Sequence, residues 1–105
     1  QVVVNAVAAK LAERLAPVVV THGTDTMVET GLRLQQAFPN LQAPIILTGA
    51  MTPLGFENSD GLQNLTESLF AARRLPAGVW LVMHNQVFPI SKVRKDRALA
   101  RFVAL

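Results

Sequence analysis

A short segment after the first strongly apolar run concentrates reactive side chains. It reads Thr21-His22-Gly23-Thr24-Asp25-Thr26, with three hydroxyls, an imidazole and a carboxylate. A hydroxyl becomes a nucleophile when a neighbouring base takes its proton and a third group orients that base, so this cluster could support acyl transfer. The alternative is a helix start in which Asp25 or Thr26 is the N-cap and Glu29 completes a capping box. Such a cap leaves the other two hydroxyls and the imidazole unexplained. Gly23 would give this turn a backbone path that other residues resist.

Two other polar segments follow apolar runs, at Thr48–Pro53 and at His84-Asn85-Gln86. Ligands of open α/β sheets bind beyond the carboxyl ends of the strands, so we expect the site there. A metal site of His22, Asp25 and His84 is one alternative, but histidines beside a sheet are more often structural, and we expect no metal. We also expect no cofactor, because the glycines form neither a G-x-G-x-x-G fingerprint nor a P-loop, and no G-x-S-x-G motif is present.

The elements that must position these segments follow from hydrophobic periodicity. Continuous apolar runs rich in β-branched residues predict buried parallel strands, and segments with a helical period predict crossover helices. The strands are expected at 18–21, 45–48 and 79–83, and the helices at 5–15, 26–38 and 62–74. This alternation predicts an α/β fold with an open, mostly parallel sheet, right-handed crossovers and a Rossmann/flavodoxin-like three-layer arrangement. Val87-Phe88 is expected as a short edge strand, and Val93 to Val103 as a basic, partly helical end.

The composition limits the class of protein. With 105 residues, 50% of them hydrophobic and 16% charged, the chain can form one folded domain and is not expected to be disordered. It has no cysteine, which excludes disulfides and thiolate chemistry, and we predict a cytoplasmic protein. The net charge of +3 comes from the segment after residue 91. No aromatic residues alternate with those charges, so a solvated face is favoured, and we expect neither a nucleic-acid nor a membrane partner.

The polar segments also carry a resemblance to a known family. The run from Val18 to Met27 resembles the second signature of the bacterial-type L-asparaginase/glutaminase family. The segments Pro44–Met51 and Ser59-Asp60-Gly61, the latter followed by Asn64-Leu65, fall in the order and spacing of that family. Lys95 matches the position of the family's active-site lysine. The resemblance implies an asparaginase-like α/β domain over residues 1–105.

The same resemblance implies a reaction and the residues that perform it. Thr24 and Asp25 match the threonine and aspartate of the family's second active-site triad, and Lys95 its lysine. The implied reaction is hydrolysis of the side-chain amide of asparagine, or of glutamine, to the acid and ammonia. Asp25 would pair with the substrate α-ammonium, and the backbone carbonyl of Ala50 would receive the amide. The resemblance therefore implies substrate contacts at Gly23, Thr24, Asp25 and Ala50.

Other members of the family carry features that this chain lacks. The chain has no tyrosine and no Thr-Gly-Gly run, so the family's N-terminal catalytic loop and its C-terminal domain are not expected within residues 1–105. A non-catalytic α/β module that binds an amino acid or a protein through the same strand ends is therefore the alternative function. Exposed sheet edges and apolar helix faces predict a homo-oligomer.

Overall fold

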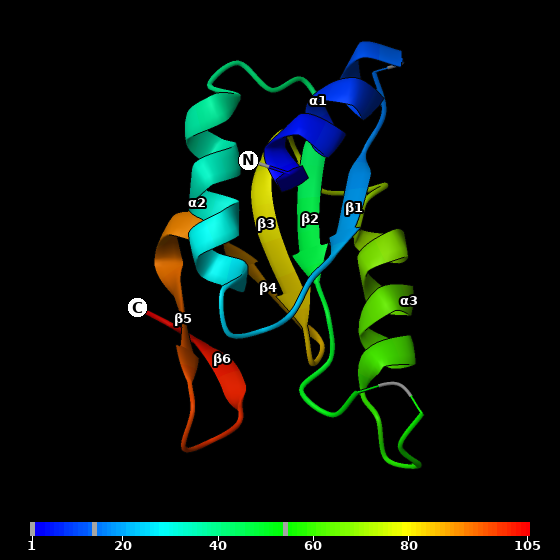
Figure 1. Ribbon diagram of the computed structural model, residues 1–105, viewed down its shortest axis with the longest axis vertical. Coiled ribbons are helices and arrows are strands. Elements are labelled where there is room, and N and C mark those ends of the chain that lie inside the picture. Colours follow the sequence, from blue (N-terminus) through cyan, green and yellow to red (C-terminus); the bar gives the residue numbers. More distant parts are fainter. Residues whose placement is uncertain (1, 14, 54) are drawn as a thin grey trace.

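A computed structural model describes residues 2–13, 15–53 and 55–105 (Figure 1). Helices and strands alternate along the first three quarters of the chain, and a small hairpin follows them. In chain order the elements are α1 (Val2–Glu13), β1 (Val18–Thr21), α2 (Met27–Ala37), β2 (Pro44–Thr48), α3 (Gly61–Ala71), β3 (Gly78–Met83), β4 (Gln86–Pro89), the 3-10 turn η1 (Ile90–Lys92), β5 (Val93–Asp96) and β6 (Arg101–Ala104). The three predicted parallel strands and the three predicted helices that alternate with them are confirmed, with ends that shift by a few residues.

The main sheet has four strands in the order β1-β2-β3-β4. β1, β2 and β3 are parallel, in a register that pairs Thr21 with Thr48, whereas β4 runs antiparallel to β3. Only His84 and Asn85 separate β3 from β4, and both have positive φ angles, 51° and 62°. Two such residues form a type I′ turn, whose twist suits a tight hairpin. The predicted edge strand at Val87-Phe88 is thus confirmed.

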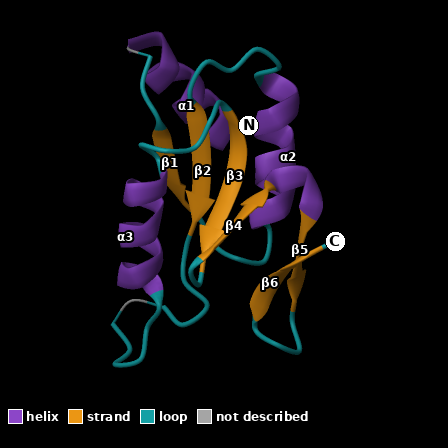
Figure 2. Cartoon of the chain, turned by 180° about the vertical axis from the view of Figure 1, so that it is seen from behind, coloured by secondary structure: helices purple, strands orange, loops and turns teal. Residues whose placement is uncertain are grey.

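The helices cover both faces of this sheet. Figures 1 and 2, which view it from opposite sides, show α1 and α2 on one face and α3 on the other. This is the three-layer α/β arrangement that the sequence predicts. The strands β1, β2 and β3 nevertheless lie side by side in chain order. The crossover through α2 and the crossover through α3 therefore advance in the same direction across the sheet but on opposite faces, so they have opposite hands. The prediction that all crossovers are right-handed is therefore wrong for one of them, a departure from a strong general preference.

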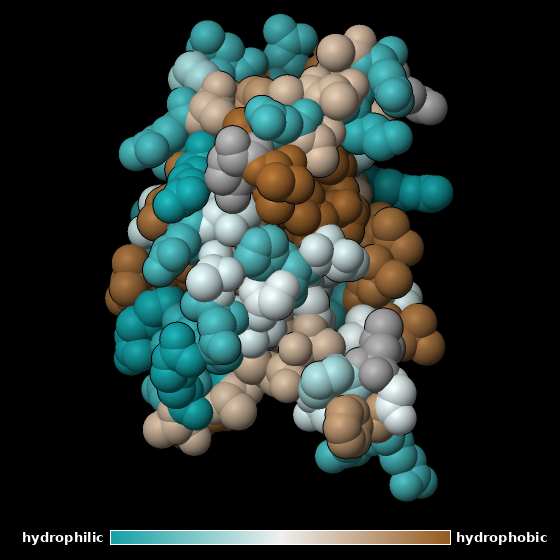
Figure 3. Space-filling model, in the orientation of Figure 1, coloured by the Kyte–Doolittle hydropathy of each residue, from teal (hydrophilic) through white to brown (hydrophobic). Residues whose placement is uncertain are grey.

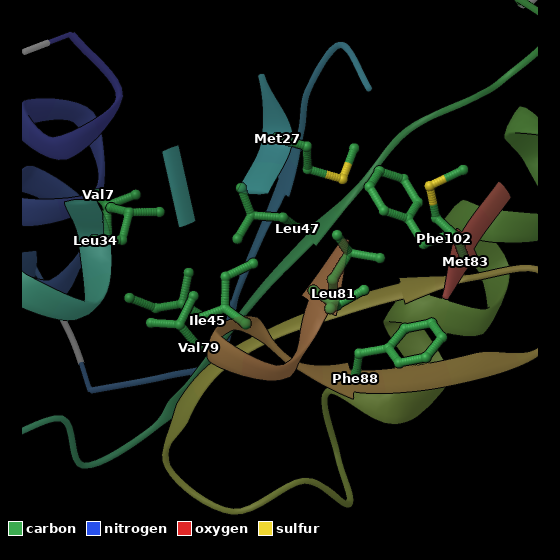
Figure 4. Packing of buried hydrophobic residues seen from close by; sticks show 12 residues of the cluster. Val7, Met27, Leu34, Ile45, Leu47, Val79, Leu81, Met83, Phe88 and Phe102 are labelled. Carbon is green, nitrogen blue, oxygen red and sulfur yellow. The ribbon is translucent and has the colours of Figure 1, made fainter. Parts of the chain in front are cut away.

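The main core lies between the sheet and the layer of α1 and α2. Every residue of β2 is buried, as expected for a central parallel strand. Odd-numbered residues of β2 and β3 meet apolar side chains from both helices and from the segment after β4 (Figure 4). The cluster consists of Val7, Met27, Leu34, Ile45, Leu47, Val79, Leu81, Met83, Phe88, Ile90, Val93 and Phe102. This cluster fixes the ends of β2 and β3, from which polar loops emerge.

The basic end of the chain is a hairpin, so the prediction of a partly helical end is wrong. β5 and β6 pair antiparallel, with Lys95 opposite Phe102 and Val93 opposite Ala104. Val93 and Phe102 are both 2% exposed. Residues nine apart lie on opposite sides of an α-helix, which turns 100° per residue, so a helix could not bury both against one core. The alternating faces of two paired strands place them together.

Two surface features concern the edge and the outside of the sheet. β1 pairs on one side only within the described chain, and a hollow of about 320 Å³ lies between it and α1. Hydrophobic side chains gather on the surface near the N-terminus in Figure 3, and valines of both elements line the hollow. Leu15, the last residue of the first predicted helix, follows the observed helix and is exposed. None of the described helices combines the length and the apolar character needed to cross a bilayer.

Candidate active site

The loops that follow β1 and β2 lie against each other. The His22 N–H donates to the Thr48 carbonyl at 2.9 Å, and the Thr48 hydroxyl donates to the Val82 carbonyl at 2.7 Å. A Cβ at Gly49 would overlap the His22 carbonyl oxygen, whereas a Cβ at Gly23 would have no neighbour within 4 Å. Gly23 also lacks a positive φ. The special backbone freedom expected at Gly23 is therefore not used, and the close approach of the two loops depends on Gly49.

The loop after β1 meets the hairpin at the three residues expected to be catalytic. Lys95 Nζ donates to Thr24 Oγ1 at 2.9 Å and to Asp25 Oδ1 at 2.7 Å. Thr24 is half-buried, and the Lys95 side chain is 17% exposed, because it shares the inner face of the hairpin with Phe102. Thr26 is the N-cap residue of α2, but its side chain makes no capping hydrogen bond. Thr26 thus stands where the helix-start alternative places an N-cap, but the capping bond of that alternative is not formed, and the Asp25 carboxylate bonds side chains of the hairpin.

A fourth residue, Arg97, joins this cluster. Its guanidinium donates to Asp25 Oδ1 at 2.7 Å, and both side chains are 69% exposed. The hydrogen bond from Lys95, followed by that from Arg97, lowers the pKa of the Asp25 carboxyl below its usual 3.8. Asp25 is thus ionised at neutral pH. Sequence reasoning missed Arg97 because it stands in the turn between β5 and β6, where no periodicity indicates which way a side chain points.

Ala50 lies half-buried in the neighbouring loop. The residues that follow it are held by Asp60, whose Oδ2 accepts from the Met51 N–H at 3.1 Å and whose Oδ1 accepts from the Thr52 N–H at 2.9 Å. His84 Nε2 lies 2.6 Å from the same carboxylate. Burial raises the pKa of the Asp60 carboxyl, but the hydrogen bonds from Thr52, Met51 and His84 outweigh it and bring the pKa to about 2. Asp60 belongs to the quoted motif, but its contacts to this loop could not be inferred from the sequence.

The histidines do not converge on a metal site. His22 Nδ1 lies 2.7 Å from the Gly23 carbonyl oxygen, and Nε2 lies 3.0 Å from the Thr30 hydroxyl. Since a carbonyl only accepts, Nδ1 carries a proton, and both ring nitrogens have partners within the protein. His84 is engaged with Asp60. The part of the chain that the structure describes contains no group of three or more His, Cys, Asp or Glu residues able to hold a metal ion. The metal alternative based on His22, Asp25 and His84 therefore finds no support in the geometry.

Comparisons with known proteins show which family this chain belongs to. The family model described as "Asparaginase, N-terminal" matches residues 1–102. L-asparaginase from Thermococcus kodakarensis is 34% identical over 82 residues, which cover 78% of this chain and 25% of that protein. A glutamyl-tRNA(Gln) amidotransferase protein from Aeropyrum pernix is 48% identical over 71 residues, covering 66% of this chain and 17% of that protein.

The fold is also that of solved asparaginases. The thermostable L-asparaginase from Thermococcus kodakarensis superimposes with a TM-score of 0.86 and 30% sequence identity, covering 99% of this chain and 32% of that chain. The chain thus spans about a quarter of the length of the L-asparaginase that it resembles in sequence. Since the model of the family's N-terminal domain matches nearly all of its residues, the chain belongs to the asparaginase family.

Proposed function

We propose that this chain carries the Thr24, Asp25 and Lys95 cluster of an amidohydrolase that releases ammonia from the side-chain amide of asparagine, with glutamine as a second substrate. The observation that carries the proposal is the position of Lys95 Nζ, which bonds both the Thr24 hydroxyl and the Asp25 carboxylate. These are the contacts that an activated hydroxyl needs, namely a base within reach and an acid that orients the base. The family relationship supports the same reaction.

The proposed reaction is an acyl transfer in two steps. The step requires that the Lys95 ammonium, which pairs with Asp25, first loses a proton to solvent. The resulting amine takes the proton of Thr24 while one of its own N–H groups stays hydrogen-bonded to Asp25. Thr24 Oγ1 forms a bond to the carbon of the substrate amide, the C–N bond breaks, and the nitrogen leaves as ammonia with the transferred proton. Water then attacks the Thr24 ester, releasing the carboxylic acid and restoring the hydroxyl.

The substrate would lie between the two loops that meet at Gly49. The Asp25 carboxylate would bind the α-ammonium of the amino acid, and the Ala50 carbonyl would accept a hydrogen bond from the amide nitrogen. Gly23 and Thr24 would contact the substrate from the loop after β1. The open space around Gly23 supports this arrangement, because a Cβ there would have no protein neighbour within 4 Å.

An ammonia-release assay with asparagine and glutamine tests the proposed function. The parent protein is expected to turn over asparagine, Thr24→Ala to lose activity, and Thr24→Ser to keep part of it. Thr26→Ala is a matched control, because Thr26 is an exposed neighbour whose hydroxyl makes no capping bond. Absence of turnover in the parent, or equal activities of Thr24→Ala and Thr24→Ser, contradicts the catalytic role.

The alternative is a module that binds an amino acid without hydrolysing it. The exposure of Asp25 favours this alternative. Lys95 and Arg97 both bond Asp25 Oδ1, and they hold its carboxylate in place on an open surface. Calorimetric titration with aspartate distinguishes the two functions. Binding that disappears in Asp25→Ala, with no release of ammonia from asparagine, supports the alternative. Absence of aspartate binding removes it.

We further propose that the chain self-associates and acts in the cytoplasm. The side of β1 that carries no strand in the described chain and the valine-lined hollow beside α1 support self-association, since bare strand edges pair readily. Size-exclusion chromatography with light scattering should show a species larger than a monomer, and a monomer at high concentration contradicts this. Fractionation of the source cells tests the location.

A further inference from the structure

The start of α3 is built in an unusual way. Asp60 is the N-cap residue of α3, but its side chain makes no capping bond. Ser59 takes over part of that role, since its hydroxyl accepts from the Gly61 N–H at 3.1 Å and donates to the Thr52 carbonyl at 2.6 Å. Both oxygens of Asp60 are directed across to the loop after β2. Because N-cap carboxylates ordinarily bond their own helix, this arrangement serves the loop rather than α3.

A second buried side chain completes the attachment. Asn64 is fully buried, and its Nδ2 donates to the Gly49 carbonyl at 2.9 Å and to Asp60 Oδ2 at 3.0 Å. Its Oδ1 accepts from the His84 N–H at 2.9 Å. The loop after β2, the start of α3 and the turn between β3 and β4 are thereby joined through two adjacent side chains. Buried polar networks in which every group is paired hold a fixed geometry.

These bonds fix the two peptide groups on either side of Ala50. Asn64 holds the carbonyl of the preceding peptide, at Gly49, and Asp60 holds the N–H of the following one, at Met51. The carbonyl of that following peptide is the Ala50 carbonyl. In a planar trans peptide the N–H and C=O point in opposite directions, so an N–H held on Asp60 directs the Ala50 carbonyl away from Asp60. Within the described residues this carbonyl has no protein partner.

We infer that Asp60 is a positioning residue, which sets the direction of the Ala50 carbonyl by binding the Met51 N–H. The inference rests on the proposed function, in which that carbonyl accepts a hydrogen bond from the substrate amide. Asp60 bonds the N–H groups of Met51 and Thr52, so it acts on the Ala50 carbonyl through the main chain of residues 50–52. Misdirection of the carbonyl would leave the amino acid bound through Asp25 but misplace the scissile amide.

Steady-state kinetics with asparagine test the inference. In Asp60→Asn the amide nitrogen faces N–H donors, so we expect kcat to fall about tenfold or more, while KM changes less than about threefold. His84→Asn removes the ring but keeps both loop bonds of Asp60, and Asn tolerates the positive φ, so kcat should stay within about threefold of the parent. Glu13→Gln controls for the loss of one surface carboxylate, since Glu13 pairs with Lys10 on the exposed side of α1. Parent-like kcat in Asp60→Asn, or an equal loss in His84→Asn, overturns the inference.

Amide hydrogen exchange gives a readout that needs neither activity nor a stable variant. In the parent chain the Met51 amide should exchange about tenfold or more slowly than the amide of Glu57, which lies in an exposed loop. Equal exchange at the two amides overturns the inference. If Met51 is protected but the parent releases no ammonia, the proposed function fails while the attachment of the loop to Asp60 is upheld.

Discussion

Lys95 Nζ lies 2.9 Å from Thr24 Oγ1, although 71 residues separate the two in the sequence. The hydroxyl comes from the loop after the edge strand β1, and the amine comes from a separate two-stranded hairpin. Burial of Phe102 in the main core, opposite Lys95 in the hairpin, fixes the hairpin against the sheet. The candidate site therefore depends on packing at a distance from its polar atoms.

The two cations on Asp25 should contribute unequally to its ionisation. Lys95 is the larger cause of the lowered pKa and Arg97 the smaller. NMR titration of the Asp25 carboxyl carbon is expected to show a higher pKa in Arg97→Ala and a still higher one in Lys95→Ala. Arg101→Ala removes the same charge from an exposed residue at the start of β6, and it should leave the titration unchanged. A larger rise in Arg97→Ala than in Lys95→Ala contradicts the geometry.

The carboxyl of Asp60 should make stability depend on pH. Its pKa is lowered from 3.8 to about 2 in the folded state, so its contribution is complete above pH 3.8 and is lost as the pH falls through 2. Asp60→Asn should lower the free energy of unfolding at pH 7 by on the order of 2 kcal/mol.

Urea unfolding at several pH values measures this effect. The difference between parent and Asp60→Asn should shrink between pH 4 and pH 2, and Glu13→Gln, at a surface carboxylate, should match the parent throughout. A difference that stays constant down to pH 2 contradicts the assignment.

Much of the fold could be predicted because its signals are local. Continuous β-branched runs and helical periodicity identify β1 to β3 and the crossover helices, and prolines and glycines mark their ends. The hairpin was missed because the many basic residues of this segment obscure the pattern by which Val93 and Phe102 face the core. Its stability also comes from contacts with that core, which is distant in the sequence. The hand of each crossover likewise depends on which face of the sheet its helix covers, and hydrophobic periodicity does not indicate that face.

The same contrast holds within the site. Thr24, Asp25 and Lys95 could be named from motifs, but the roles of Arg97 and Asp60 depend on contacts between segments. The glycine required for the two loops to meet is Gly49, which sequence reasoning passed over in favour of Gly23. The close approach of Gly49 to the His22 carbonyl becomes apparent only when both loops have been placed in the structure.

A pair of glycine substitutions tests how the two loops meet. Gly49→Ala forces a Cβ against the His22 carbonyl and should reduce the free energy of unfolding by about 1–3 kcal/mol. Gly23→Ala meets open space without a positive φ, so it should change stability by less than about 0.5 kcal/mol. Chemical denaturation of both variants measures the difference. Equal effects of the two substitutions would show that the loops do not approach as closely as described.

The central claim is that Thr24 and Lys95 act as one unit, and a double-mutant cycle on kcat/KM for asparagine tests it most directly. Groups that act in one step lose most of their effect when either is removed. We therefore predict that Thr24→Ala with Lys95→Ala is no slower than the slower single variant. Losses that multiply in the double variant would mean that the two side chains act independently, and would contradict the account.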